Sequence, residues 1–202
     1  MEIKNNKIFK YPLGKEMDGF VNEIYNENEY DRFGIKVEKG DIVLDAGANV
    51  GIFTQYALDM GASQVLAYEC FEPEFECYNK NITDNRTNCT MGFVGHNKYD
   101  LPKIFKQHNI NKIDFAKIDI EGDEWELFLK MEVDDMKKIK KWAIEFHTQF
   151  FNKIKSDDER ILYLWDFLKI LEKFSVNGFN IKFEHLHKEW DIVHLYAIQE
   201  NK

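Results

Sequence analysis

The sequence predicts an α/β protein with a doubly wound, mostly parallel seven-stranded sheet that ends in an antiparallel hairpin. Three observations predict this fold class. From residue 41 onwards, short apolar segments alternate with segments of helical periodicity. Most of the apolar segments are continuous, as strands are when helices cover both faces of a sheet. The last two strand-like segments are joined by the short polar turn Lys188–Asp191, and so short a loop favours an antiparallel pair.

The individual elements follow from local signals. Pro73 lies where a helix begins, because a missing N–H costs little there, and Asn177-Gly178 lies where one ends. The predicted helices are Gly19–Asn28, Gly51–Met60, Pro73–Ile82, Leu101–His108, Gly122–Met131 and Asp157–Phe174. The predicted strands are Asp41–Ala46, Gln64–Glu69, Thr90–Val94, Ile113–Ile118, Trp142–Phe146, Phe179–His185 and Ile192–Ile198.

The longest of these helices has the strongest amphipathic pattern. Five apolar side chains share one of its faces at helical spacing, and we expect that face to contact the sheet. The five residues are Ile161, Leu164, Trp165, Leu168 and Leu171.

A chain of 202 residues is long enough for one full hydrophobic core. We predict a main domain over residues 41–202 and an N-terminal extension, residues 1–40, that packs on it. The extension has too few apolar positions to form a core of its own.

Composition restricts the partners and the compartment. The net charge of −9 argues against nonspecific binding to nucleic acid and to anionic membrane surfaces. No run reaches the ~20 apolar residues that span a bilayer, and the first residues lack the apolar region of a signal peptide. Three cysteines, Cys70, Cys77 and Cys89, are an odd number without paired metal-ligand spacing. They favour a reduced, cytoplasmic chain, with Cys77 and Cys89 buried as small apolar residues.

The most informative segment is the glycine turn Asp45–Gly51, directly after an apolar strand and before a helix. This order brings backbone N–H groups and a helix N-terminus towards a ligand. Glu69 ends the next strand, about 20 residues further on, where a carboxylate can accept hydrogen bonds from ribose hydroxyls. Cys70 follows it and could line the same site. Together these features predict a nucleoside-binding site.

The spacing of this turn, Gly-x-x-x-Gly, differs from the Gly-x-Gly-x-x-Gly of dinucleotide-binding proteins. Ala48 stands where a second glycine would let a pyrophosphate approach the backbone. A ligand without pyrophosphate is therefore favoured, and S-adenosylmethionine offers a ribose, an adenine and an amino-acid carboxylate.

Polar side chains at the carboxyl ends of two other strands are candidates for chemistry. Asp119 and Glu121 follow one strand, and both can face the ligand only if the chain bends there. Glu145 and His147 end the neighbouring strand and project to one side of it. A carboxylate with an imidazole could act in acid–base catalysis or hold a metal ion, whereas Asp119 could instead cap the next helix. We expect Glu121 to be a buried carboxylate with a functional partner.

Several motifs together resemble the FkbM-type family of class I S-adenosylmethionine-dependent methyltransferases. The resemblance covers roughly residues 20–147. Its most discriminating segment is Lys117-Ile118-Asp119-Ile120-Glu121-Gly122. The other matching residues are the glycine turn Asp45-Ala46-Gly47-Ala48-Asn49-Val50-Gly51, then Glu69, Phe75, Asn81, Asp123 and Glu124, with Glu23-Ile24-Tyr25 and Tyr30 ahead of the first strand.

The resemblance implies that Asp45, Gly47, Asn49 and Gly51 shape the cofactor pocket and that Glu69 binds the ribose. Spacing to Phe75 and Asn81 favours Glu69 over the Glu-Pro dipeptide at Glu72-Pro73, and Cys70 stands where the family often has proline. The connection at residues 95–99, which usually contributes to the adenine pocket, is short in this chain, with His96 as its candidate contact.

The resemblance implies an S-adenosylmethionine-dependent methyltransferase that methylates an oxygen of a small hydroxylated acceptor, such as a sugar or glycan-related metabolite. Asp119, Glu121 and His147 are the residues we expect to handle the acceptor. Two alternatives stay open: an NAD-dependent oxidoreductase, which Ala48 argues against, and a non-catalytic methyltransferase-like binding module.

Overall fold

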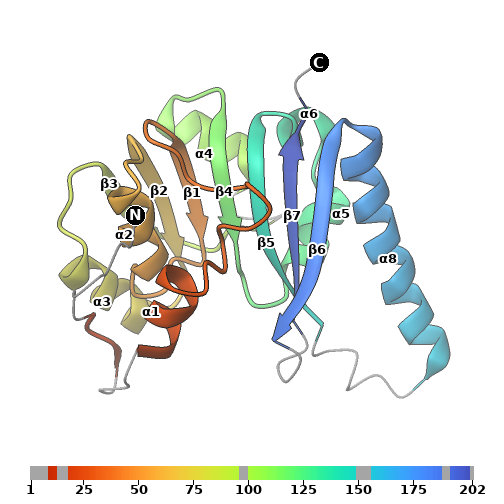
Figure 1. Cartoon of the computed structure of the whole chain (residues 1–202), viewed down its shortest axis with the longest axis horizontal. Coiled ribbons are helices and arrows are strands. Elements are labelled where there is room, and N and C mark those ends of the chain that lie inside the picture. Colours follow the sequence, from red (N-terminus) through yellow and green to blue (C-terminus); the bar gives the residue numbers. More distant parts are fainter. Residues whose placement is uncertain (1–8, 13–17, 96–99, 149–155, 188–191, 201–202) are drawn as a thin grey trace.

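The computed structural model describes residues 9–12, 18–95, 100–148, 156–187 and 192–200. Its seven-stranded sheet has the order β3-β2-β1-β4-β5-β7-β6, which confirms the predicted fold class (Figure 1). The strands are β1 Ile42–Ala46, β2 Gln64–Glu69, β3 Thr87–Met91, β4 Ile113–Ile118, β5 Ile139–His147, β6 Phe179–His187 and β7 Ile192–Gln199. Strand β7 pairs antiparallel with both β5 and β6, whereas β1 to β5 are parallel. The C-terminal hairpin therefore places its second strand inside the sheet and its first strand at the edge.

Helices cover both faces of this sheet, as expected for a doubly wound fold (Figure 1). They are α1 Asp18–Tyr25, α2 Ile52–Asp59, α3 Glu72–Asn81, α4 Leu101–His108, α5 Glu124–Lys130, α6 Val133–Met136 and α8 Asp157–Val176. The four-residue helix α6 is too short to leave a periodic pattern, and the sequence did not predict it.

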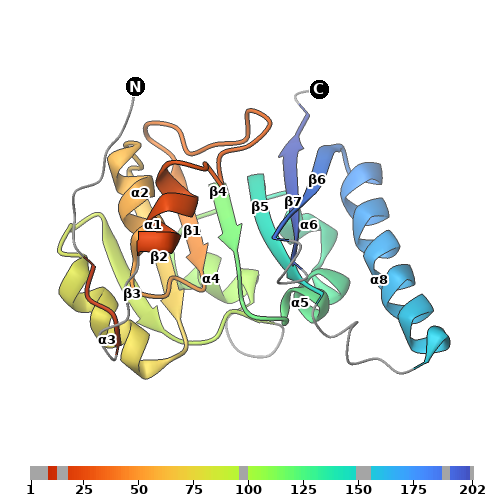
Figure 2. The same cartoon turned by 60° about the horizontal axis from the view of Figure 1, so that its bottom comes forward.

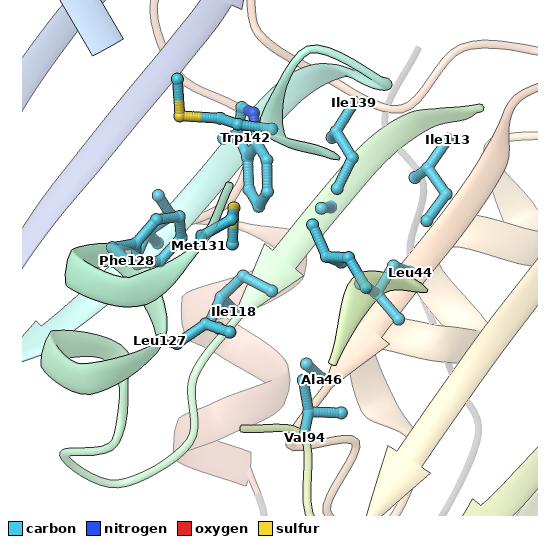
Figure 3. Packing of buried hydrophobic residues seen from close by; sticks show 14 of the residues in the cluster. Leu44, Ala46, Val94, Ile113, Ile118, Leu127, Phe128, Met131, Ile139 and Trp142 are labelled. Carbon is cyan, nitrogen blue, oxygen red and sulfur yellow. The ribbon is translucent and has the colours of Figure 1, made fainter. Parts of the chain in front are cut away.

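Alternation along the strands sends successive side chains to opposite faces. On β1, Leu44 and Ala46 join the apolar layer formed with α4, α5 and α8, while Val43 joins the layer formed with α1, α2 and α3. Figure 3 shows part of the first layer, where the rings of Phe128 and Trp142 lie 5.4 Å apart between centroids.

Two sequence predictions about individual elements are wrong. Strand β3 was expected at Thr90–Val94 but runs from Thr87 to Met91. It is an edge strand with mostly polar residues, so its own sequence is not typical of a buried strand. The prediction therefore included the apolar residues that follow it. The predicted buried face of α8 is largely exposed, with Trp165 58% exposed. Ile170 and Phe174 contact the core instead, since α8 carries apolar residues around most of its circumference and periodicity alone did not select the face.

The described part of the N-terminal extension, residues 9–12 and 18–40, forms an N-terminal segment that lies on the same side of the sheet as α2 (Figure 2). The ring centroids of Tyr25 in α1 and Tyr56 in α2 are 5.3 Å apart. Further along, the Tyr196 hydroxyl in β7 donates a hydrogen bond of 2.7 Å to the carbonyl of Glu29. The segment therefore covers the face of the sheet near the carboxyl ends of its parallel strands.

None of the helices that the structure describes combines the length and the apolar character needed to cross a membrane.

Candidate active site

One face of the sheet changes from apolar to charged at the carboxyl ends of its strands. Val43, Phe115 and Ala143 belong to the apolar layer under α1 and α2. Two residues further along each strand, on the same face, lie the buried charged residues Asp45, Lys117 and Glu145, and β5 continues to His147. The strand β7 runs in the opposite direction, so its charged residue on this face, His194, precedes Tyr196.

Strand register brings these side chains together as two cross-strand pairs, which we call the charged row. Asp45 pairs with Lys117 across β1 and β4, and Glu145 pairs with His194 across β5 and β7. The row therefore comes from residues that are far apart in the sequence.

A pocket of about 390 Å³ lies at this end of the sheet. It joins the glycine turn to the charged row and brings six of the predicted site residues together: Gly47, Ala48, Asn49, Asp119, Glu121 and His147. Other lining residues come from the N-terminal segment, from β5 and from the start of β7, among them Tyr11, Phe20, Glu29, Tyr30, Glu145 and Ile192.

The glycine turn differs from its sequence-based description in one respect. Its backbone N–H groups were expected to be available to a ligand, but they are bonded within the protein. Those of Gly47 and Ala48 donate to the carbonyl of Tyr68, and that of Asn49 donates to the carboxylate of Glu69. The N–H of Val50 donates to the Asn49 side chain, and that of Gly51 to the carbonyl of Ala48. The turn is therefore preformed, and its surface rather than its N–H groups faces the pocket.

Gly47 is required because the end of β4 approaches the glycine turn closely at this residue. Its φ is +79°, and a Cβ at this position would lie 1.7 Å from the carbonyl oxygen of Asp119. Gly51, with a φ of +94°, would place a Cβ 2.6 Å from Ile82. The first glycine thus lets the end of β4 approach the turn, and the second lets α3 pack on it.

Glu69 is buried and has both carboxylate oxygens engaged. One oxygen accepts the N–H of Asn49 and the other accepts the N–H of Phe71, each at 2.7 Å. These bonds fix the carboxylate beside the turn and hold Asn49 in a left-handed conformation with a φ of 50°. Cys70 is exposed, whereas Cys77 and Cys89 are buried as predicted.

Asp45 lies buried beneath the glycine turn and contacts α2 and β4. The side chain is fully buried, accepts a 2.6 Å hydrogen bond from the Thr54 hydroxyl, and lies 3.6 Å from Lys117 Nζ. Burial raises the pKa of Asp45, while Lys117 opposes that rise.

Lys117 connects the glycine turn to Asp119 at the end of β4. Its ammonium donates to the carbonyl of Gly47 at 2.7 Å and lies 3.1 Å from Asp119 Oδ2. Burial alone would lower the pKa of Lys117, but the carboxylates of Asp119 and Asp45 raise it above its ordinary value. Lys117 is therefore a fixed positive charge that orients one oxygen of Asp119.

His147 is held by a carboxylate on α5, the helix that follows β4. Its Nδ1 lies 3.0 Å from Oε1 of Glu124, and the same oxygen accepts the backbone N–H groups of Ile120 and Gly122. The indole N–H of Trp125 donates to the carbonyl of His147 at 3.0 Å. Although burial opposes protonation, the hydrogen bond to Glu124 and the neighbouring carboxylates raise the pKa of His147 to about 9.

Glu121 differs from the expectation of a buried carboxylate, since its side chain is 69% exposed. The chain bends at this residue, which has a φ of 57°, so Asp119 and Glu121 both reach the pocket. A left-handed conformation is uncommon for glutamate and costs of order 1 kcal/mol. Partial burial, with a contribution from Asp119, raises the pKa of Glu121.

Behind this cluster, sequence reasoning named Glu145 and Tyr30 but missed their contacts, and it did not select Glu29 or His194. The Tyr30 hydroxyl donates a 2.5 Å hydrogen bond to Oε1 of Glu145, and Nε2 of His194 lies 3.3 Å from oxygens of both Glu29 and Glu145. Burial opposes ionisation of Glu145, but the hydrogen bond from His194 lowers its pKa. Burial likewise opposes protonation of His194, while Glu145 and Glu29 raise its pKa to about 9.

A usable signal for these residues was the charge in strands β4 and β5, since Lys117 and Glu145 interrupt otherwise apolar runs on one face. His96, the candidate contact for adenine, lies outside the described residues.

The fold is that of class I methyltransferases. The METTL16 methyltransferase domain aligns with a TM-score of 0.64 and 12% identity over 96% of this chain and 74% of that chain. Fibrillarin from Aeropyrum pernix, with natively bound S-adenosyl-L-methionine, aligns with a TM-score of 0.58 and 13% identity over 83% and 70%. Precorrin-6y C5,15-methyltransferase from Geobacter metallireducens aligns with a TM-score of 0.57 and 9% identity over 95% and 94%.

A sequence comparison agrees with the predicted resemblance. The model of the methyltransferase FkbM domain matches residues 96–181, whereas no curated protein matches the chain. The predicted resemblance is therefore confirmed over these residues, and the chain has the fold of S-adenosylmethionine-dependent methyltransferases.

Proposed function

We propose that this methyltransferase methylates a hydroxyl oxygen of a small acceptor, such as a sugar or a glycan-related metabolite. The observation that carries the proposal is the pocket of about 390 Å³ that joins the glycine turn to carboxylates and an imidazole. A pocket of this size suits a small molecule. Carboxylates and imidazoles bind hydroxyl groups and accept their protons.

The cofactor half of the pocket fits S-adenosylmethionine. Ala48 and Asn49 line the pocket, whereas Glu69 does not line it and is fixed behind them by the N–H of Asn49. Glu69 is the charged acceptor that we expect to bind ribose hydroxyls. When bound, the cofactor supplies a methyl group on a positively charged sulfur. The carboxylates of Asp119 and Glu121 line the same pocket and favour a cationic ligand.

The acceptor half would bind the hydroxyl through Asp119, Glu121 and His147. Of the three, Glu121 is the best proton acceptor, because its side chain reaches solvent and its raised pKa brings it closer to neutral pH. Asp119 and His147 are more firmly held, by Lys117 and Glu124, and suit the orientation of the acceptor. Such positioning supplies much of the rate enhancement when the leaving group is already good.

Two measurements test this proposal in sequence. Calorimetric titrations with S-adenosylmethionine, S-adenosylhomocysteine and NAD should give binding of the first two alone. Incubation with a panel of hydroxylated, amino and thiol acceptors should then give S-adenosylhomocysteine together with an O-methylated product, identified by mass spectrometry. Exclusive methylation of nitrogen, carbon or sulfur would contradict the oxygen assignment, and binding of NAD alone would contradict the cofactor assignment.

A further inference from the structure

His147 presents its second ring nitrogen to the pocket. Because Nδ1 is paired with the buried Glu124, Nε2 points towards Asp119 and Glu121, whose nearest oxygens lie 3.8 Å and 3.6 Å away. These distances exceed hydrogen-bond length. The His147 side chain is only 5% exposed, so among the described residues a nearly buried nitrogen faces the pocket without a hydrogen bond.

The spacing of the surrounding ligand atoms suits a bound cation. One oxygen of Asp119, one oxygen of Glu145 and a ring nitrogen of His147 all lie within 4.8 Å of one another. Oxygen and nitrogen ligands bind divalent ions at about 2.0–2.2 Å, so two ligands of one ion lie up to about 4.4 Å apart. Small side-chain rotations would therefore bring the three atoms around one ion.

Each of these three side chains is also oriented by a second residue. Glu124 holds Nδ1 of His147, Lys117 holds Oδ2 of Asp119, and Tyr30 donates to Oε1 of Glu145. Metal-binding histidines usually donate their other N–H to a carboxylate, and metal-binding carboxylates usually accept hydrogen bonds from neighbours. This set of partners is typical of a metal site.

A second group of similar composition serves as an internal comparison. Glu29, Glu145 and His194 also lie within reach of one ion, but all three are buried. Nε2 of His194 is 3.3 Å from an oxygen of each carboxylate, so these three groups already contact one another directly. The His147 group is wider and opens into the pocket, so it is the better cation site.

We propose that Asp119, Glu145 and His147 bind a divalent cation in the acceptor half of the pocket. One nitrogen and two carboxylate oxygens suit an ion such as Mn²⁺. The use of this ion rests on the proposed function, whereas its binding does not. In methyl transfer to oxygen, the cation would bind the acceptor hydroxyl and lower its pKa. The O–H bond would break with its proton passing to the carboxylate of Glu121.

Binding of Mn²⁺ tests the site without cofactor or acceptor. Electron paramagnetic resonance of the metal-depleted protein titrated with Mn²⁺ should give one bound ion per chain. Asp119→Asn, Glu145→Gln and His147→Asn should each weaken binding at least tenfold. His108→Asn and Glu126→Gln are matched controls, because His108 bonds to Tyr68 and Glu126 pairs with Lys130, and both should bind as the wild type does.

A spectroscopic readout separates a ligand from a structural role. Bound Mn²⁺ should show coupling to one histidine nitrogen, and this coupling should disappear in His147→Asn while circular dichroism stays unchanged. If Glu145→Gln fails to fold, Asp119→Asn decides, since its side chain is partly exposed. No Mn²⁺ binding to the wild type, or equal affinity in ligand and control variants, would overturn the proposal. A separate titration of S-adenosylmethionine in the presence of a chelator shows whether the cofactor half works independently of the ion.

Discussion

The two halves of the pocket are built in different ways. The proposed cofactor half is a contiguous turn, Asp45–Gly51, whose shape comes from backbone hydrogen bonds and is closed by Glu69. The acceptor half is assembled from side chains of β4, β5 and the N-terminal segment, which strand register brings together. A proposed cofactor site of this kind can therefore be predicted from a short motif, whereas the proposed acceptor site depends on the order and register of the whole sheet.

The halves meet at Gly47, and the largest effect is expected there. Gly47→Ala places a Cβ 1.7 Å from the Asp119 carbonyl and requires a left-handed backbone. We expect loss of S-adenosylmethionine binding by calorimetry and a decrease of about 3 kcal/mol in the free energy of unfolding. Gly178→Ala is the control, because its φ is +84° but its Cβ would meet nothing within 4 Å. It should cost only about 1 kcal/mol and leave cofactor binding unchanged. Equal effects of both substitutions would show that the contact with β4 is unimportant.

The cofactor half should respond to the loss of one charge. Glu69→Gln keeps the size of the side chain but removes its charge and one of the two oxygens that accept the N–H groups of Asn49 and Phe71, so we expect S-adenosylmethionine affinity to fall roughly 10- to 100-fold. Glu72→Gln, on the exposed start of α3, should leave the affinity unchanged. The reverse order of effects would assign ribose binding to the Glu72-Pro73 dipeptide and refute the role of Glu69.

The acceptor half should respond to a change in the N-terminal segment. Tyr30→Phe removes the hydrogen bond to Glu145, and we expect turnover with a methyl acceptor to fall roughly tenfold, with cofactor affinity retained. Tyr25→Phe, whose hydroxyl bonds to Asp59 away from the pocket, should leave turnover unchanged. If both variants lose turnover equally, the loss comes from altered packing of the N-terminal segment and not from the lost hydrogen bond to Glu145.

The smallest effect is expected at the boundary of the cofactor half. Cys70 follows Glu69 but is exposed, so Cys70→Ser should change S-adenosylmethionine affinity by no more than about twofold, or about 0.4 kcal/mol. A larger loss, measured by the same calorimetric titration, would place the thiol against the bound cofactor.

The fold could be predicted from the sequence because local signals determine it. Gln64–Glu69, Leu101–His108 and Ile113–Ile118 have the bounds that were predicted, since apolar runs with clear breaks define them. The exposed face of α8 was not predictable, because choosing between two apolar faces requires knowledge of the neighbouring strands. The edge position of β3 likewise depends on sheet order and not on its own residues.

The candidate site could be predicted only in part. Asp119, Glu121 and His147 were selected because they follow strands whose ends meet, and the structure places them in one pocket. The roles of Tyr30 and Glu124 could not be predicted, because each acts through a partner that is distant along the chain. Tyr30 contacts Glu145, and Glu124 contacts His147. The internal hydrogen bonds of the glycine turn could not be foreseen, because a motif gives residue types and not their bonding.

The central claim is that cofactor binding and acceptor chemistry reside in separate halves of one pocket. His147→Asn tests it most directly, with S-adenosylmethionine affinity and S-adenosylhomocysteine formation measured on the same preparation. We expect affinity within about threefold of the wild type and turnover reduced roughly 100-fold or more. Retained turnover, or a parallel loss of cofactor binding in a folded variant, would contradict the separation.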